Sequence, residues 1–324
     1  MTLPPSSSSD PAAGALGLPT AEIAPPEPDT PVTPGTAPRR RNSQFTDIWR
    51  RFRRNKLAMV GLVIIAVLVV LAIIGPFITP YDPFEQNLLN TLQPPGSSHW
   101  FGTDVLGRDL YSGIIYGARV AMIVGVCTVA FSLLIGVSLG ALAGFKGGAW
   151  DAVISRIMDV FLAFPQLIGA IVVVRAIGNG VATVIVALVV LGWVTTGRLM
   201  RGQMLALREA EYVEAARSIG ADNGRIVRRH ILPNAIAPVF VYAFTSIGVA
   251  VVAMASLSYL GIGVPPDIPE WGRLISQAVN FLQVEGKAFL WIAPAAAIAI
   301  TTLGFAFVAD GLRDALDPKL RGGN

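Results

Sequence analysis

Long runs of apolar side chains dominate the chain from residue 57 onward. A helix needs about 20 apolar residues to cross roughly 30 Å of hydrocarbon. Runs without Asp, Glu, Lys or Arg occur at 57–78, 120–145, 238–262 and 289–308. A further apolar stretch is interrupted by Arg175 and by Gly-Asn-Gly at 178–180, and it divides into 160–174 and 181–196. The pattern predicts an all-α, polytopic membrane protein with six transmembrane helices.

Lys and Arg are concentrated in alternate segments between the apolar runs. They cluster before the first run, between 198 and 229, and near the C-terminus, whereas the loops at 79–119 and 263–288 hold few. Because loops rich in Lys and Arg stay in the cytoplasm, we expect both termini to be cytoplasmic. The expected organisation is a basic juxtamembrane segment at 45–56, a first helix at 57–78, an extracytoplasmic loop at 79–119, a core of five helices at 120–310 and a cytoplasmic tail at 311–324.

Composition agrees with a membrane protein and leaves little room for other chemistry. Only 14% of the residues are charged, against roughly 25% in soluble domains. Residues 1–44 hold ten prolines among Ser, Thr and Ala, a composition that cannot bury enough apolar surface to fold. We expect a disordered tether there, with a regulatory tail as the alternative. One cysteine and two distant histidines provide no disulfide and no metal-ligand spacing.

The polar stretch at 203–234 separates two apolar runs. From Gln203 to Ile219 it contains no Pro or Gly, which favours a helix. Gly220 can end that helix in a left-handed conformation, Asp222 can cap a second short helix, and Pro233 would close or kink it. The sequence predicts a helical hairpin, and its residues alone leave open whether it docks a partner protein or is a solvated loop.

Several motifs identify a resemblance. Glu214-Ala215-Ala216, followed after three residues by Gly220 and later by Leu232-Pro233, resembles the EAA loop of ABC importer permeases. An Ile that this family usually places two positions before the Leu is replaced by His230. The stretches at 49–63, 99–119, 269–275 and 310–321 are similar to dipeptide and oligopeptide permeases of the C type. Nickel and glutathione permeases share much of this pattern.

The resemblance implies a set of partners and a contact surface. It implies a second, similar permease subunit, two ATPase subunits or domains, an extracytoplasmic substrate-binding protein and the lipid bilayer, with no nucleic acid. It places the ATPase contact at the coupling helix of the EAA loop: Glu214, Ala215, Ala216, Gly220 and Ala221. The chain has no G-x-x-x-x-G-K-[ST] phosphate loop, so we expect no bound cofactor and no enzyme activity, with ATP and Mg used by the partner ATPases.

Two groups of residues are candidates for the transport function. Polar side chains in or beside the spans tend to face a bundle or a water-filled path, although hydroxyls also bond back to their own helix. The path candidates are Gln166, Thr245, Ser246, Ser256 and Ser258. In the loops expected outside, the candidates for docking the binding protein are Asp104, Arg108, Asp109, Glu270 and Trp271. The first three of these could instead form a local salt-bridged cap.

The expected function is that of a transmembrane permease subunit of an ATP-driven ABC importer for dipeptides or oligopeptides. The motifs also fit the same machine importing nickel, haem or glutathione. An ion-coupled secondary transporter is less favoured, because it would place ionisable groups near the middle of its spans. In the second span Gly136, Gly140 and Gly144 recur every four residues, which favours close packing against a helix of the same chain over a contact with a second subunit.

Overall fold

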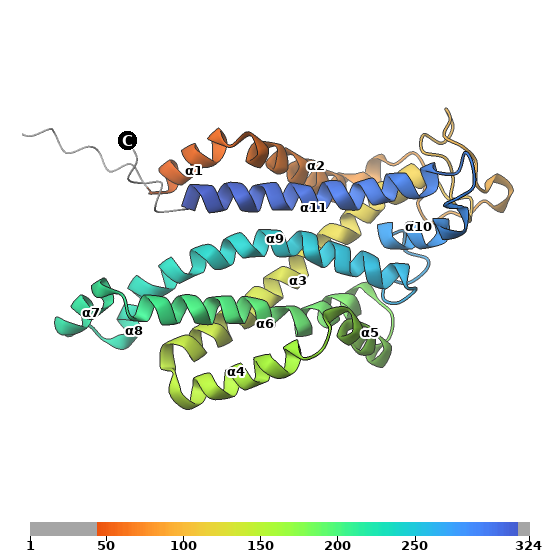
Figure 1. Cartoon of the computed structure of the whole chain (residues 1–324). Coiled ribbons are helices and arrows are strands. Elements are labelled where there is room, and N and C mark those ends of the chain that lie inside the picture. The colour runs from red at the N-terminus through yellow and green to blue at the C-terminus, as the bar shows by residue number, and fades with distance from the viewer. Residues whose placement is uncertain (1–43, 317–324) are drawn as a thin grey trace, which may run out of the picture. The chain divides into compact units, whose positions relative to one another are not determined.

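A computed structural model describes residues 44–316, and its regular elements are helices (Figure 1). The expected N-terminal tether at 1–44 lies outside this range except for its last residue. The expected C-terminal tail at 311–324 lies partly outside it, and residues 311–316 continue the last helix. The basic segment at 45–56 forms most of a helix of its own, whose Phe52 packs on Val308 and Ala315.

The helices follow one another in this order: α1 (Gln44–Arg54), α2 (Lys56–Ile78), η1 (Leu88–Asn90), α3 (Leu110–Lys146), α4 (Gly148–Leu162), α5 (Gln166–Ile177), α6 (Val181–Arg208), α7 (Glu211–Ser218), α8 (Asn223–Ile226), η2 (Val227–Ile231), α9 (Leu232–Tyr259), α10 (Trp271–Ala278), η3 (Val279–Phe281) and α11 (Phe289–Leu316). η1 and η3 are 3₁₀ turns, and η2 is a π-helical turn.

Apolar helices long enough to span a membrane make up most of the described range. Five segments qualify: Lys56–Ile78, Leu110–Lys146, Val181–Arg208, Asn223–Tyr259 and Phe289–Leu316. α4 and α5 add a sixth if the two count as one span, although they meet at an angle of 87°. The all-α, polytopic fold class is confirmed, and the count of six remains a prediction.

Two helix boundaries differ from the predicted bounds of the spans. The second span begins at Leu110 instead of 120, because the Asp109 carboxylate accepts the Ser112 N–H at 2.8 Å and caps the helix. The loop predicted at 79–119 therefore ends at Asp109. The helix predicted at 160–174 is broken between Leu162 and Gln166. Pro165 lacks an N–H and disfavours helical backbone at the residue before it, so the helix stops and restarts in a new direction.

The polar stretch at 203–234 also differs in detail from its prediction. α6 continues to Arg208, and a break precedes α7, so 203–219 is not one helix. Pro233 does not end the following helix. It lies in the first turn of α9, directly after the π turn of η2. The wider π turn gives the proline ring room beside the preceding carbonyls, so the helical path runs on into the span.

α3 and α6 pack together through the row of small residues on α3. A Cβ atom at Gly136 would lie 2.7 Å from the Trp193 carbonyl oxygen, and one at Gly140 would collide with the Gly197 carbonyl. One at Gly144 would lie 2.6 Å from the Met204 Cβ. The glycine row therefore lets two helices of the same chain approach, as predicted.

α2 and α9 pack on α11, and α2 lies on the outside of this group. Only 17% of its apolar window is buried, and its outward face carries large aliphatic side chains such as Val63, Val70 and Ile73. A continuous apolar face of this kind on a spanning helix is what lipid tails cover.

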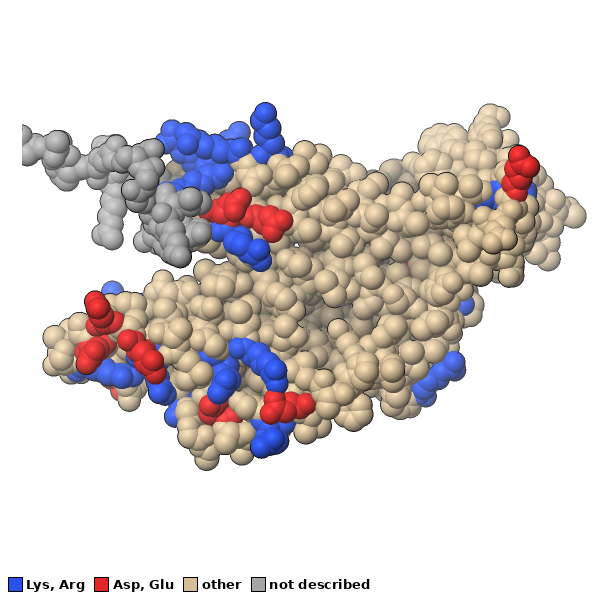
Figure 2. All heavy atoms as spheres, in the orientation of Figure 1, with Lys and Arg blue, Asp and Glu red and all other residues tan. Residues whose placement is uncertain are grey.

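Charged residues lie mainly at one end of the helices. α1, α7, α8 and the C-terminal end of α11 lie at that end, and α10 and the 79–109 loop lie at the other (Figure 1). We name these the hairpin end and the loop end. On the face that Figure 2 shows, Lys, Arg, Asp and Glu gather at the hairpin end and the middle is free of them. There, Asp151 and Asp159 of α4 form ion pairs with Arg201 and Arg198 of α6.

Candidate functional site

The hairpin formed by α7 and α8, residues 211–226, turns at Gly220. Gly220 has a φ of +81°, the left-handed conformation that the sequence predicts for it and that glycine adopts without strain. Its N–H donates to the Arg217 carbonyl at 2.9 Å, and the Ala221 N–H donates to the Ala216 carbonyl at 3.0 Å. The Asp222 carboxylate then accepts the Gly224 N–H at 2.9 Å and caps α8.

One face of the hairpin is anchored in the helices that carry it. Val213 and Ile226 are fully buried and belong to one apolar cluster with Met200 and Met204 of α6. Ile231, Ala235 and Val239 join the same cluster from η2 and α9. The hairpin is therefore packed against two spans and cannot move far without moving them.

The other face of the hairpin is open. Of the five predicted coupling residues, Glu214, Ala215 and Gly220 are exposed, and Ala221 is half-buried. Ala216 is buried instead and belongs to the apolar cluster described above, which we name the anchoring cluster. Within residues 44–316, neither Glu214 nor Arg217 forms an ion pair.

Ile219 stands next to the turn with 85% of its surface exposed. Sequence reasoning missed this residue. The available signal was a large apolar residue directly before the turn glycine in an otherwise polar segment. Ile219 lies within the exposed face of the hairpin, between the exposed Arg217 and Gly220 in the sequence.

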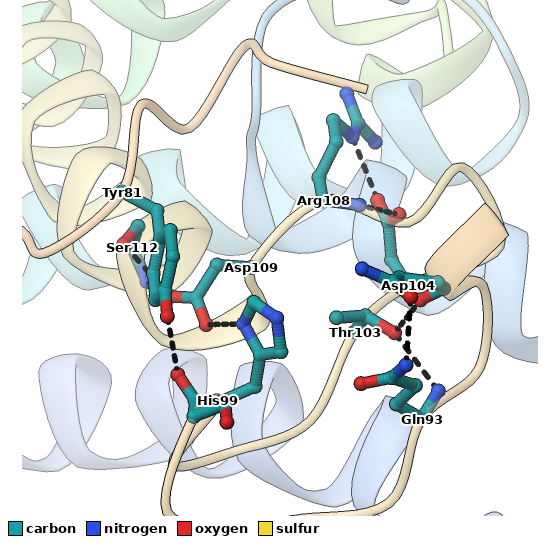
Figure 3. Close-up of polar contacts among 10 residues, drawn as sticks. Tyr81, Gln93, His99, Thr103, Asp104, Arg108, Asp109 and Ser112 are labelled. Carbon is teal, nitrogen blue, oxygen red and sulfur yellow. Dashed lines mark hydrogen bonds and ion pairs between the residues drawn. The ribbon is translucent and has the colours of Figure 1, made fainter. Parts of the chain in front are cut away.

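At the loop end, in contrast to the hairpin, charged side chains are buried and paired. The Asp104 and Arg108 side chains are 5% and 3% exposed and form an ion pair, with Arg108 Nε donating to Asp104 Oδ2 at 2.7 Å (Figure 3). The other oxygen of Asp104 accepts the N–H groups of Leu106 and Arg108. Arg108 Nη2 also donates to Gln277 Oε1 at 3.0 Å, which ties the loop to the end of α10.

Asp109 has a structural role in the same loop. Its Oδ2 atom accepts the N–H and the hydroxyl of Ser112, and its Oδ1 atom lies 2.9 Å from His99 Nδ1 (Figure 3). Asp104, Arg108 and Asp109 thus form the local cap that the sequence left as the alternative. None of these side chains presents an exposed surface to a binding protein.

Glu270 and Trp271, the other two predicted docking residues, are also buried. Glu270 caps α10, because its carboxylate accepts the N–H groups of Gly272 at 2.9 Å and Arg273 at 3.1 Å. Trp271 Nε1 donates to the Ile114 carbonyl at 2.9 Å, with its ring against Gly117. Burial raises the pKa of the Glu270 carboxyl above its ordinary value, and the two backbone N–H groups lower it only in part.

The predicted path residues do not form one group. Gln166 and Ser246 line a single pocket of about 110 Å³ between α3, the α4–α5 break, α6 and α9. Thr245 is exposed and lies outside this pocket, and Ser258 is fully buried. Ser256 lines a separate, mainly apolar pocket beside α10. Ser246 and Ser256 donate to carbonyls of their own helix, those of Tyr242 and Val252.

The same pocket contains polar residues that sequence reasoning missed. Thr128 and Ser132 of α3 line it, together with Thr195, Thr196 and Tyr242. Both α3 hydroxyls are buried, and neither has a hydrogen-bond partner among residues 44–316. Their signal in the sequence was weak: two hydroxyl residues four apart in an apolar span, which a helix normally accommodates by bonding back to itself.

The arrangement of the helices is found in a solved transporter. The chain is similar to a chain of a crystal structure described as that of an amino acid ABC transporter with histidines, with a TM-score of 0.50 and 18% sequence identity. The match covers 62% of this chain and 92% of that one. The similarity shows that this chain shares the fold of that one.

The sequence then gives the family. Residues 136–322 match the binding-protein-dependent transport system inner membrane component family, and residues 43–95 match the N-terminal transmembrane domain of oligopeptide transport permease C. The chain belongs to the family of binding-protein-dependent transport system inner membrane components, which confirms the resemblance seen in the EAA and C-type motifs. It is a transport subunit and not an enzyme.

Three relatives illustrate the range of the family. The oligopeptide transport system permease protein OppC of Bacillus subtilis is 42% identical over 86% of this chain and 91% of that protein. The dipeptide transport system permease protein DppC of Alkalihalophilus pseudofirmus is 40% identical over the same shares. The glutathione transport system permease protein GsiD of Escherichia coli is 40% identical over 85% of this chain and 91% of that protein.

Proposed function

We propose that this chain forms half of the translocation path of an ATP-driven importer of dipeptides or oligopeptides. The assignment of peptides as the cargo rests on one observation: this chain is 42% identical, over 86% of its length, to an oligopeptide permease. Dipeptide permeases at a similar level of identity support it. A second, similar permease subunit supplies the other half of the path.

The hairpin end is the cytoplasmic end. It carries the clusters of Lys and Arg that favour retention inside, and both termini belong on that side of a bacterial inner membrane. The loop end then faces the extracytoplasmic space. Its buried ion pair and caps hold the 79–109 loop in one shape, and the exposed Leu88, Leu89 and Trp100 are the surface that it offers to a substrate-binding protein.

The open face of the hairpin is the contact with a partner ATPase. Ile219 inserts into an apolar groove of that partner, Glu214 pairs with a basic group, and Ala215 and Gly220 allow close approach because they have little or no side chain. Ala216 and Ala221 act from behind, as packing under this surface. This order of roles follows from the exposure of each residue.

Coupling follows from the anchoring cluster. Val213 and Ile226 on the hairpin pack with Met200 and Met204 on α6, and the cluster continues into α9. When ATP binding closes the two ATPases, a displaced hairpin pushes α6 and α9, and both of these helices line the pocket at the α4–α5 break. ATP and Mg are used by the two ATPase subunits or domains, and this chain binds no cofactor of its own.

Glutathione is the second candidate cargo, because a glutathione permease is 40% identical to this chain. Free nickel is less favoured. Among the described residues, no group of three His, Cys, Asp or Glu side chains is placed to hold a metal ion.

The test is purification of a tagged chain from its native host in mild detergent, with mass spectrometry of what accompanies it. We expect a second permease, ATPases and a binding protein. The purified complex, reconstituted in vesicles, should import tri-alanine only when ATP is present on the side of the membrane where the ATPases lie. Import without ATP would overturn the proposal, and import of glutathione but not tri-alanine would replace the cargo.

A further inference from the structure

Thr128 and Ser132 differ from several other hydroxyl residues of the spanning helices. They share the lack of a partner in the described chain with the buried Ser258 of α9, which does not line this pocket. Ser138, Ser246, Thr301 and Thr302 each donate to the carbonyl four residues earlier, at distances from 2.7 to 2.9 Å. Thr128 and Ser132 make no such bond and have no other partner within residues 44–316. They are 5% and 6% exposed, and a buried hydroxyl without a partner costs about 1–3 kcal/mol. Their placement therefore needs a ligand or water to offset that cost.

Both hydroxyls line the pocket at the α4–α5 break, and so does the start of α5. α5 has 12 residues, and its cap, Pro165, offers no side-chain hydrogen bond. Its first backbone bond is from the Gly169 N–H to the Pro165 carbonyl, so the N–H groups of residues 166–168 lack a backbone acceptor in the described chain. A helix start inside a broken span presents such N–H donors to a ligand's oxygen atoms.

Neutral hydrogen-bonding groups make up the whole polar lining of the pocket. They are Thr128, Ser132, Gln166, Thr195, Thr196, Tyr242 and Ser246, and no Lys, Arg, His, Asp or Glu lines it. An ion would be unpaired here and costly to desolvate. Hydroxyl and amide groups can each donate and accept. This is the chemistry that matches a peptide unit, which has one N–H donor and one C=O acceptor.

We propose that this pocket is a subsite for the main chain of the transported peptide, in which Thr128 and Ser132 hydrogen-bond a peptide unit that enters from the path. This subsite rests on the proposed function and extends it. The permease recognises the main chain that all peptides share and makes no use of their side chains. Its volume of about 110 Å³ exceeds the roughly 10–15 Å³ that one water needs. Waters fill it between transport events, and the peptide unit displaces them.

The test compares tri-alanine with the analogue in which an ester replaces the second of its two amides, the one between the second and third residues. The ester has nearly the same shape but lacks the N–H and is a weaker acceptor. The reconstituted transporter, with its own binding protein, is measured for ATP-dependent uptake of each compound at concentrations below saturation. The variants are Thr128→Val with Ser132→Ala, and Ser138→Ala as the control, because Ser138 lies on the same helix but is exposed and bonded to Leu134.

The wild-type complex should prefer tri-alanine over the ester. The double variant should import tri-alanine about tenfold more slowly, as expected from the loss of two hydrogen bonds, and should lose most of the preference. Its melting temperature should be unchanged, since neither hydroxyl bonds to another residue of the described chain, and Ser138→Ala should behave as the wild type. Because the binding protein is the same throughout, a changed preference belongs to the permease.

Equal uptake and an equal preference in the double variant would overturn the subsite while leaving the proposed function intact, and would assign the pocket to water alone. A wild-type complex that imports no peptide would overturn the proposed function, and the subsite with it.

Discussion

The 79–109 loop and the α7–α8 hairpin are both polar segments between apolar helices, and they use their charges in opposite ways. In the loop, Asp104 and Arg108 are buried against each other and against Gln277 of α10. In the hairpin, Glu214 and Arg217 are exposed, and within the described residues neither forms an ion pair. The loop satisfies its polar groups from within the chain, whereas the hairpin leaves them for another molecule.

The difference shows what a charged residue near a membrane surface implies. A buried and paired charge contributes to one defined shape and is costly to disturb. An exposed charge adds little to the stability of the chain that carries it, so it is free to serve a contact. The two regions should therefore respond differently to substitution: the loop in stability, and the hairpin in partner binding.

The largest effect is expected from Asp104→Asn at the loop end. The substitution keeps the shape but leaves the Arg108 charge buried without a counter-ion, which costs about 3–5 kcal/mol. Asp222→Asn in the hairpin is the matched control, because Asn caps helices as well as Asp does. Thermal unfolding of the purified complex in detergent measures both. Equal melting temperatures for the two variants would remove the contrast in stability.

The next effect compares two glycines with similar backbone. Gly107 has a φ of +73° and Gly220 a φ of +81°, so alanine costs about 1–2 kcal/mol of strain at each. A Cβ at Gly107 would collide with the Asn87 carbonyl, whereas one at Gly220 would meet nothing within 4 Å. Gly107→Ala should therefore destabilise the protein by about 1–3 kcal/mol more than Gly220→Ala does, because the added methyl group overpacks the site. A larger loss of melting temperature in Gly220→Ala would contradict the open geometry of the hairpin turn.

A smaller change in free energy is expected when two exposed apolar residues are compared for their effect on ATPase binding. Ile219→Ser should weaken retention of the ATPase by about tenfold, or about 1.4 kcal/mol, with an unchanged melting temperature, because Ile219 is 85% exposed. Leu89→Ser is the control at the loop end, where Leu89 is 95% exposed. Titration of the purified ATPase onto the detergent-solubilised permease measures both. Equal affinities would place the ATPase contact elsewhere.

The smallest effect concerns Glu270 and pH. Its pKa is raised in the folded chain by burial, so its contribution to stability is present below its unfolded pKa of about 4.3 and is lost as pH rises through the folded value. Glu270→Gln should remove this dependence. Relative to the wild type, the variant should gain stability as the pH is raised from pH 5 to pH 8. Parallel melting temperatures across that range would show that Glu270 does not titrate differently on folding.

Sequence reasoning predicted the site in part. It found the turn at Gly220 and the cap at Asp222, because both depend on backbone preferences of single residues. It missed Ile219, and it offered Glu270 and Trp271 as candidates for docking the binding protein, both of which are buried. It also missed Thr128 and Ser132, whose missing helix bonds depend on a rotamer and on the neighbouring helices and not on residue type.

The sequence by itself determined the membrane class, most of the apolar helices and the family, because hydropathy and motif spacing are local properties. Tertiary structure alone decided which polar groups are buried and which are open. Asp104 and Arg108 are enclosed with Gln277, which lies 169 residues after Arg108. The pocket that holds Thr128 and Ser132 exists because α4 and α5 break beside α6 and α9. Burial is a sum over neighbours that are distant along the chain, and no short stretch of sequence contains that sum.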